Sequence, residues 1–175
     1  MSAIGLDPRT PVLIGVGQAA ERIEDPGYAG LSPIALALHA ARSAVADSQA
    51  DADAVIAAID TVAATRQFEN SSARAVAPLG RSTKFPLSVA HRLGAVPKRA
   101  VLDVVGGQSP QHLVSEFSRA IEAGLADVVL LAGAEAISTI RHYAGTEHKP
   151  DFSDDPVGSI EDRGFGLTEI GRAHV

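Results

Sequence analysis

Four short apolar runs divide the chain, and each is bounded by glycine, proline or polar residues. They cover residues 11–17, 59–64, 100–105 and 127–133. Apolar runs of this length are typical of strands buried on both faces, because helices cover both sides of a parallel sheet. The pattern therefore predicts four strands, the first of them at residues 11–17.

Between these runs, apolar residues recur with helical spacing in three stretches. The first opens with a Ser-Pro pair at Ser32, where serine is the expected N-cap and proline the first helical residue. The second covers residues 86–94 and ends in glycine. The third runs from Ser109 to about residue 123, and its own Ser-Pro pair predicts Ser109 as N-cap. Its apolar stripe consists of Leu113, Val114, Phe117 and Ile121.

Strands and helices alternate along the chain, and this order predicts the fold class. We expect an α/β fold with a mostly parallel sheet and helices on both faces. Residues 65–85 form a long polar stretch, a kind of loop that is more often functional than idle. Helical and strand periodicity fades after residue 140. We therefore assign residues 1–139 to one αβ domain and residues 140–169 to the start of a loop region.

The composition narrows the class of protein. With 46% apolar and 21% charged residues, the chain has a globular profile. It contains no membrane-length apolar run and no secretory signal, so we expect a cytoplasmic protein without a membrane partner. A net charge of −6 gives no electrostatic footprint for nucleic acid. Cysteine is absent, which excludes disulfides, thiolate metal sites and cysteine nucleophiles.

The last six residues have an unusual origin in our interpretation. Residues 170–175 are what the codons ATC GGA AGA GCA CAC GTC encode, and this string resembles read-through from a sequencing adapter. We predict that the native reading frame diverges near Glu169. Residues 170–175 are accordingly left out of the fold assignment.

Two other patterns suggest a dinucleotide-binding site and a metal site, but each lacks a feature that the site requires. Gly15-x-Gly17-x-x-Ala20 resembles a dinucleotide-binding fingerprint, yet that motif needs a helix to begin at once, and residues 21–31 are loop. A nicotinamide oxidoreductase is therefore the weakest of our hypotheses. Acidic and histidine residues also gather near the end of the chain without a recognised ligand spacing, so we predict no metal site and a solvated loop. These residues are His142, His148, Asp151, Asp154 and Asp155.

The most informative segment is residues 103–138. A strand leads into a Gly-Gly-Gln-Ser turn and an amphipathic helix, which ends in Ala-Gly-x-Ala-Asp at residues 123–127. A short apolar strand then leads to Gly-Ala-Glu-Ala-Ile-Ser at residues 133–138. This pattern resembles the thiolase superfamily, most closely the sterol-carrier-protein type thiolases and their lipid-transfer relatives. The resemblance extends more loosely over residues 10–165.

The resemblance places the family's nucleophilic cysteine at Gly107 and its Cys-x-Ser serine at Ser109. A thiol there would be activated by the helix N-terminus, but glycine offers no nucleophile, so we expect no covalent acyl-enzyme at this position. Ser109 has no visible base, and we favour its role as a cap. His112 lies one turn into the helix, where an acid–base role competes with a solvent-facing one. We therefore assign no catalytic residue, and Ser109 and His112 are the candidates.

The resemblance also implies the class of ligand. The expected protein acts on or binds acyl-CoA or lipid thioesters without the usual cysteine, with the CoA thioester as substrate and no bound cofactor. Thiolases consist of two similar halves, usually form homodimers, and carry a catalytic histidine and a second cysteine in the carboxy-terminal half. The resemblance implies that this chain covers the first half, so we expect it to be inactive alone. We also expect the apolar stripe of the helix from Ser109 to be exposed, because in thiolases that helix packs between the two halves.

Two functions remain open. One is an enzyme of the acyltransferase family, or a variant that cleaves carbon–carbon bonds without a covalent intermediate. The alternative is a non-catalytic thiolase-like subunit that binds CoA esters or scaffolds an accessory protein.

Overall fold

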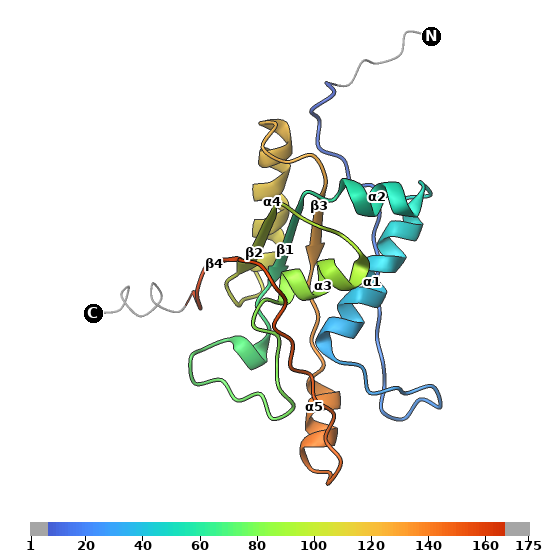
Figure 1. Cartoon of the computed structure of the whole chain (residues 1–175), viewed down its shortest axis with the longest axis vertical. Coiled ribbons are helices and arrows are strands. Elements are labelled where there is room, and N and C mark those ends of the chain that lie inside the picture. The colour runs from blue at the N-terminus through green and yellow to red at the C-terminus, as the bar shows by residue number, and fades with distance from the viewer. Residues whose placement is uncertain (1–6, 167–175) are drawn as a thin grey trace, which may run out of the picture.

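A four-stranded parallel sheet forms the centre of the computed structural model, which describes residues 7–166 (Figure 1). Its strands lie in the order β3-β1-β2-β4, and every pairing is parallel. The predicted α/β class is therefore confirmed. The strands are β1 (Thr61–Thr65), β2 (Arg99–Asp103), β3 (Val129–Ala132) and β4 (Glu161–Asp162).

Helices connect these strands. They are α1 (Pro33–Asp47), α2 (Ala52–Ala58), α3 (Phe85–Leu93), α4 (Ser109–Glu122) and α5 (Ile137–Ala144), with a 3-10 turn η1 (Phe68–Asn70). The predicted helices correspond to α1, α3 and α4. Sequence periodicity missed α2 because it spans only 7 residues and is started locally by Asp51, whose carboxylate accepts from the amide of Ala54. It also missed α5 and β4.

Apolar side chains fill both sides of the sheet. On one side, α1 and α3 pack over Val62 and Leu102. On the other side, α4 covers Ala63 and Val101 with Leu113 and Phe117. Alternate residues of β1, β2 and β3 thus point to opposite helix layers, as expected for a doubly covered parallel sheet. In residues 7–166, no helix is long and apolar enough to cross a membrane.

The predicted first strand, residues 11–17, is wrong. This segment belongs to no strand of the described chain, and its backbone lies against α1 instead. A Cβ added at Gly17 would lie 2.0 Å from the carbonyl oxygen of Ala40, so glycine allows this close approach. Its apolar side chains remain largely in solvent: Val12 is 65% exposed, Leu13 82%, Ile14 51% and Val16 61%.

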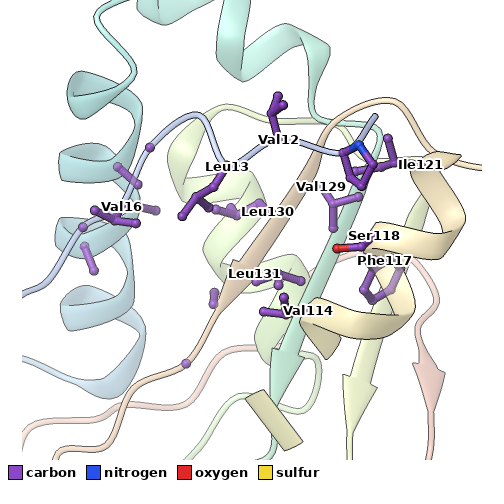
Figure 2. Close-up of a pocket in the computed structure, with 18 of the residues that line it drawn as sticks. Val12, Leu13, Val16, Val114, Phe117, Ser118, Ile121, Val129, Leu130 and Leu131 are labelled. Atoms are coloured by element: carbon purple, nitrogen blue, oxygen red, sulfur yellow. The ribbon is translucent and has the colours of Figure 1, made fainter. Parts of the chain in front are cut away.

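A cavity of about 540 Å³ separates this segment from β3 (Figure 2). We call it the sheet slot. Residues 11–17 and β3 line two of its sides, and α1 and α4 contribute Ala44 and Phe117. Residues 11–17 do not form a strand because the cavity keeps their backbone away from β3, the strand with which they would pair. The prediction that α4 exposes its apolar stripe is wrong for Leu113 and Phe117, because both are buried against β1 and β2, whereas Val114 is 47% exposed. Exposed apolar side chains of residues 12–16 lie beside the sheet slot instead.

Candidate functional site at the start of α4

A glycine turn joins the carboxyl end of β2 to α4, and it contains Gly107, where the resemblance predicts the family nucleophile. Gly106 has φ +149°, and a Cβ there would lie 2.5 Å from the side-chain oxygen of Gln108. Gly107 is different, because no atom lies within 4 Å of a Cβ added there. The fold therefore demands glycine at residue 106 but leaves room for a side chain at residue 107.

The same turn presents unpaired amide groups. The amide of Ser109 donates to the carbonyl of Gly106 at 3.1 Å, and that of His112 donates to Gln108 at 2.9 Å. Among the described residues, the amides of Gly107 and Gln108 have no acceptor. They lie at the N-terminal, positive end of α4. Such a turn can bind an anion or a carbonyl oxygen on which negative charge develops.

Ser109 is not the N-cap that the sequence predicted. Gln108 occupies the cap position without a side-chain hydrogen bond, and Ser109 is the first helical residue. The Ser109 Oγ donates to the Asp103 Oδ2 at 2.6 Å. The prediction failed because a buried carboxylate at the end of β2 takes this hydroxyl. Ser109 is fully buried, so its hydroxyl is held away from solvent.

His112 lies beside the same carboxylate. Its Nδ1 is 3.3 Å from the Asp103 Oδ2, and its Nε2 is 4.0 Å from a Glu116 oxygen. The His112 side chain is 56% exposed, so the ring combines a buried partner with an accessible face. The structure thus brings the two weak sequence candidates, Ser109 and His112, together on Asp103.

Asp103 was not singled out in the sequence, although it is the most buried acidic residue near the turn. Burial pushes the pKa of Asp103 upward, but hydrogen bonds from Ser109 and His112 and the charge of Arg163 outweigh it. The net result is a pKa below the ordinary value of 3.8. An acidic residue inside an otherwise apolar run, three residues before the Gly106–Gly107 turn, was the available signal.

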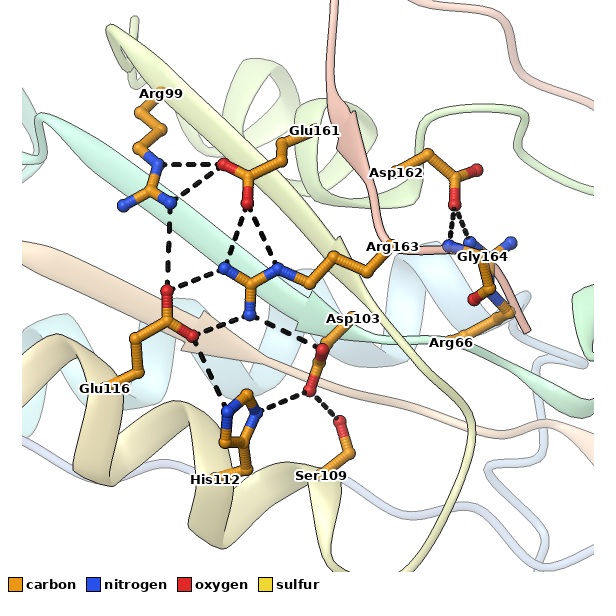
Figure 3. Close-up of polar contacts among 10 residues, drawn as sticks. All are labelled: Arg66, Arg99, Asp103, Ser109, His112, Glu116, Glu161, Asp162, Arg163 and Gly164. Carbon is orange, nitrogen blue, oxygen red and sulfur yellow. Dashed lines mark hydrogen bonds and ion pairs between the residues drawn. The ribbon is translucent and has the colours of Figure 1, made fainter. Parts of the chain in front are cut away.

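An ion-pair network extends from this carboxylate (Figure 3). Arg163 binds both oxygens of Glu116 at 2.6 Å, approaches Glu161 at 3.0 Å and reaches Asp103 at 3.5 Å. Arg99 pairs with Glu161 at 2.8 Å. The hydrogen bond from Arg163 holds the pKa of Glu116 below its usual value. Sequence reasoning missed this network because Arg163 is 47 residues from Glu116.

The glutamate of the Gly-x-Glu-x-x-Ser pattern has a different role. The Glu135 Oε1 accepts a hydrogen bond from the amide of Phe68 at 2.8 Å, which attaches the end of β3 to the loop after β1. Burial raises the pKa of Glu135. The neighbouring Glu69 has its pKa raised to about 7 by burial and by the charge of Glu135, against the lowering effect of Arg81.

Four of the acidic and histidine residues near the end of the chain have ordinary partners, and Asp151 accepts from the amide of Ser153 at 2.8 Å. Asp154 pairs with Arg92 at 3.3 Å, and Asp155 with Lys84 at 3.2 Å. The ring of His142 packs edge-on against Tyr28. Within residues 7–166, no group of three acidic or histidine residues is arranged to hold a metal ion. Residues 170–175, assigned to an adapter, lie outside the described residues.

The parallel sheet and its helices match the α/β fold that the thiolase resemblance predicts, and one solved structure is similar to this chain. The chain is similar to a monomeric SCP2-thiolase-like protein type 1 from Mycobacterium smegmatis, with 49% identity and a TM-score of 0.59. The match covers 73% of this chain and 24% of that chain. This similarity supports membership of the thiolase superfamily, and the chain spans about a quarter of that neighbour's length. No family model and no curated protein matches.

Proposed function

We propose that a protein containing this chain binds acyl-CoA or lipid thioesters at the turn before α4, and acts on them without a covalent acyl-enzyme. The observation that carries this proposal is the open Gly107 position between two unpaired amides. These amides are suited to hold the thioester carbonyl oxygen and to stabilise negative charge on it. The CoA thioester is the substrate in this proposal, and no resident cofactor is needed.

Binding can be tested by titrating the chain with acetyl-CoA in a calorimeter. We expect Gly107→Leu to abolish binding without unfolding the protein, because the new side chain has free space and would cover the amides. Gly145→Leu is the matched control, since its Cβ would meet no atom closer than 4.0 Å and it lies at the end of α5. Equal affinity of the two variants would reject the turn as the thioester site.

Catalysis is the finer part of the proposal. We infer that a protein containing this chain is an enzyme that cleaves or forms carbon–carbon bonds in CoA esters, with proton-transfer groups supplied from outside residues 7–166. A histidine-bearing motif elsewhere in the reading frame, and turnover of acetoacetyl-CoA by the longer protein, would support it. Absence of turnover by a longer protein that still binds the ester would reject it.

The alternative is a non-catalytic subunit that binds CoA esters or scaffolds an accessory protein. One observation favours it: the Ser109 hydroxyl is buried and committed to Asp103, so it cannot act as a replacement nucleophile. Ester binding by the longer protein without turnover would be the result expected for this role.

The oligomeric state is a separate proposal. The general thiolase resemblance favours a homodimer, whereas the neighbour from Mycobacterium smegmatis is described as monomeric. Because of the 49% identity to that neighbour, we infer a monomer for the longer protein. Light scattering that gives twice the monomer mass at micromolar concentration would contradict this inference.

A further inference from the structure

A short segment forms the edge of the sheet next to β2, whose carboxyl end leads to the candidate site. Residues 161–166, which we call the strap, begin with β4 and continue past it. The amide of Arg163 donates to the carbonyl of Leu102 at 3.0 Å. A Cβ added at Gly166 would lie 2.9 Å from the Cβ of Val104. The strap therefore runs along β2 and its continuation, toward the Gly106–Gly107 turn.

Apolar burial contributes little to holding the strap beyond the half-buried Phe165, whose ring centroid lies 4.9 Å from the Arg66 guanidinium carbon. None of its residues is buried, and the two residues of β4 are both exposed. Its backbone pairing is also short, since β4 pairs only with Val101 and Leu102. A segment of this kind usually has a low free energy of local opening. Its ordered position must therefore come from other contacts.

Charged contacts hold the strap in its ordered position (Figure 3). Arg163 forms the two-pronged pair with Glu116 of α4, and Glu161 pairs with Arg99 of β2. Arg66, which is buried after β1, pairs with Asp162 and donates to the carbonyl of Gly164 at 2.9 Å. Two-pronged arginine–carboxylate pairs are among the stronger charged contacts in proteins. The strap is thus held to three elements by charge.

We propose that residues 161–166 form an electrostatic strap that closes the side of the candidate site and opens when the Arg163–Glu116 pair is broken. This inference rests on the proposed function only in assigning a ligand to the turn. The strap is linked to the turn itself, because Arg163 also contacts Asp103, and Asp103 holds Ser109 at the start of α4. Opening the strap therefore removes one partner of the carboxylate that fixes α4.

Acid should open the strap. The groups that face it are Arg99 and Asp103 from β2, His112 and Glu116 from α4, and Arg66 after β1. The hydrogen bond from Arg99 lowers the pKa of Glu161, as Arg163 does for Glu116. Because these carboxyl pKa values are lowered in the closed strap, the ionised carboxylates stabilise it fully at pH values above the ordinary carboxyl pKa of 4.5. This stabilisation is lost as pH falls through the lowered pKa values. We therefore expect opening in acid and no opening between about pH 6 and 8.

Hydrogen exchange of the 175-residue chain, followed by mass spectrometry without ligand, tests the strap directly. Arg163→Gln should speed exchange of residues 161–166 about tenfold or more, while β1 and β3 change little. Arg92→Gln is the matched control, because it breaks a single surface pair with Asp154 at 3.3 Å. Glu116→Gln should also speed exchange of the strap, but by less than Arg163→Gln, because Arg163 keeps its contacts with Glu161 and Asp103. The double variant should exceed Arg163→Gln only slightly.

Two results would overturn the strap. One is unchanged exchange of residues 161–166 in both variants. The other is an equal increase across β1 and β3, which would make the pair part of the global core. The wild-type chain gives a check that needs no variant, since faster normalised exchange of the strap is expected at about pH 3.5 than at about pH 7. Acetyl-CoA titration of the same samples tests the proposed function separately.

Discussion

The Ser109 hydroxyl donates to the Asp103 carboxylate at 2.6 Å, and this bond fixes the first residue of α4 to the last residue of β2. The Gly106–Gly107 turn lies between these two residues. Because both side chains are buried, the bond is shielded from water and the turn is held between two fixed points. The orientation of the unpaired amides in the turn depends on this support.

Ser109→Ala should therefore destabilise the protein. The substitution leaves the buried Asp103 without its shortest hydrogen bond, and we expect a loss of about 1–3 kcal/mol in the free energy of unfolding. Urea unfolding monitored by circular dichroism measures it. Ser115→Ala on the same helix is the control, since Ser115 makes only an exposed contact with Gln111 at 3.4 Å. Equal midpoints for the two variants would show that the buried bond contributes little.

Periodicity predicted most of the fold because the elements of the sheet and its two helix layers are locally encoded. The apolar runs found β1, β2 and β3, and the Ser-Pro pair found the start of α1, where the Ser32 Oγ accepts from the amide of Ala35 at 3.2 Å. The same pair at Ser109 failed as a cap signal, because Asp103 competes for the hydroxyl. Sequence spacing alone contains no information on that competitor.

Residues 11–17 show a second limit. Their apolar run is typical of a buried strand, but a strand also needs a partner in register, and the sheet slot separates this segment from β3. The network around Arg163 shows a third limit. Its members come from β2, α4 and β4, and no short motif connects them, so only the folded chain reveals the strap. The Gly107 position was found through the family resemblance, and the structure adds its open surroundings.

We predict that copies of the chain associate with one another through the apolar surface beside the sheet slot. Leu13→Ser should reduce binding of a hydrophobic dye and self-association of the chain, with little change in its melting temperature, because Leu13 is 82% exposed beside the slot. Leu125→Ser is the matched control, since Leu125 is 81% exposed but does not line the slot. Dye fluorescence and light scattering provide the readouts. Equal effects of both substitutions would show that exposure anywhere, rather than the slot, drives association.

Because of Glu69, we predict that the stability of the protein depends on pH between about 4.5 and about 7. Its pKa is raised from 4.5 to about 7, so the folded protein retains a proton that the unfolded chain releases. Stability should therefore fall as pH rises from 4.5 to about 7 and level off above that value. Glu69→Gln should remove this decline and add about 1 kcal/mol at about pH 8, a value reduced for partial solvent exposure.

Urea unfolding at several pH values checks this prediction. Glu122→Gln, on the exposed surface of α4, is the control and should leave the pH dependence unchanged. A wild-type stability that does not decline over this range would contradict the assigned role of Glu69.

The central proposal is that the turn before α4 corresponds to the turn that activates the nucleophile in thiolases, with Gly107 in the nucleophile's place. Gly107→Cys tests it most directly, because a side chain fits there and the protein has no other cysteine. The new thiol should have a pKa below the ordinary ~8.5, lowered by the α4 N-terminus. After incubation with acetyl-CoA, intact-mass spectrometry should show one acetyl group on Gly107→Cys and none on the wild type or on Gly145→Cys. A stable acetyl group on the wild type, or equal slow labelling of both cysteine variants, would contradict the account.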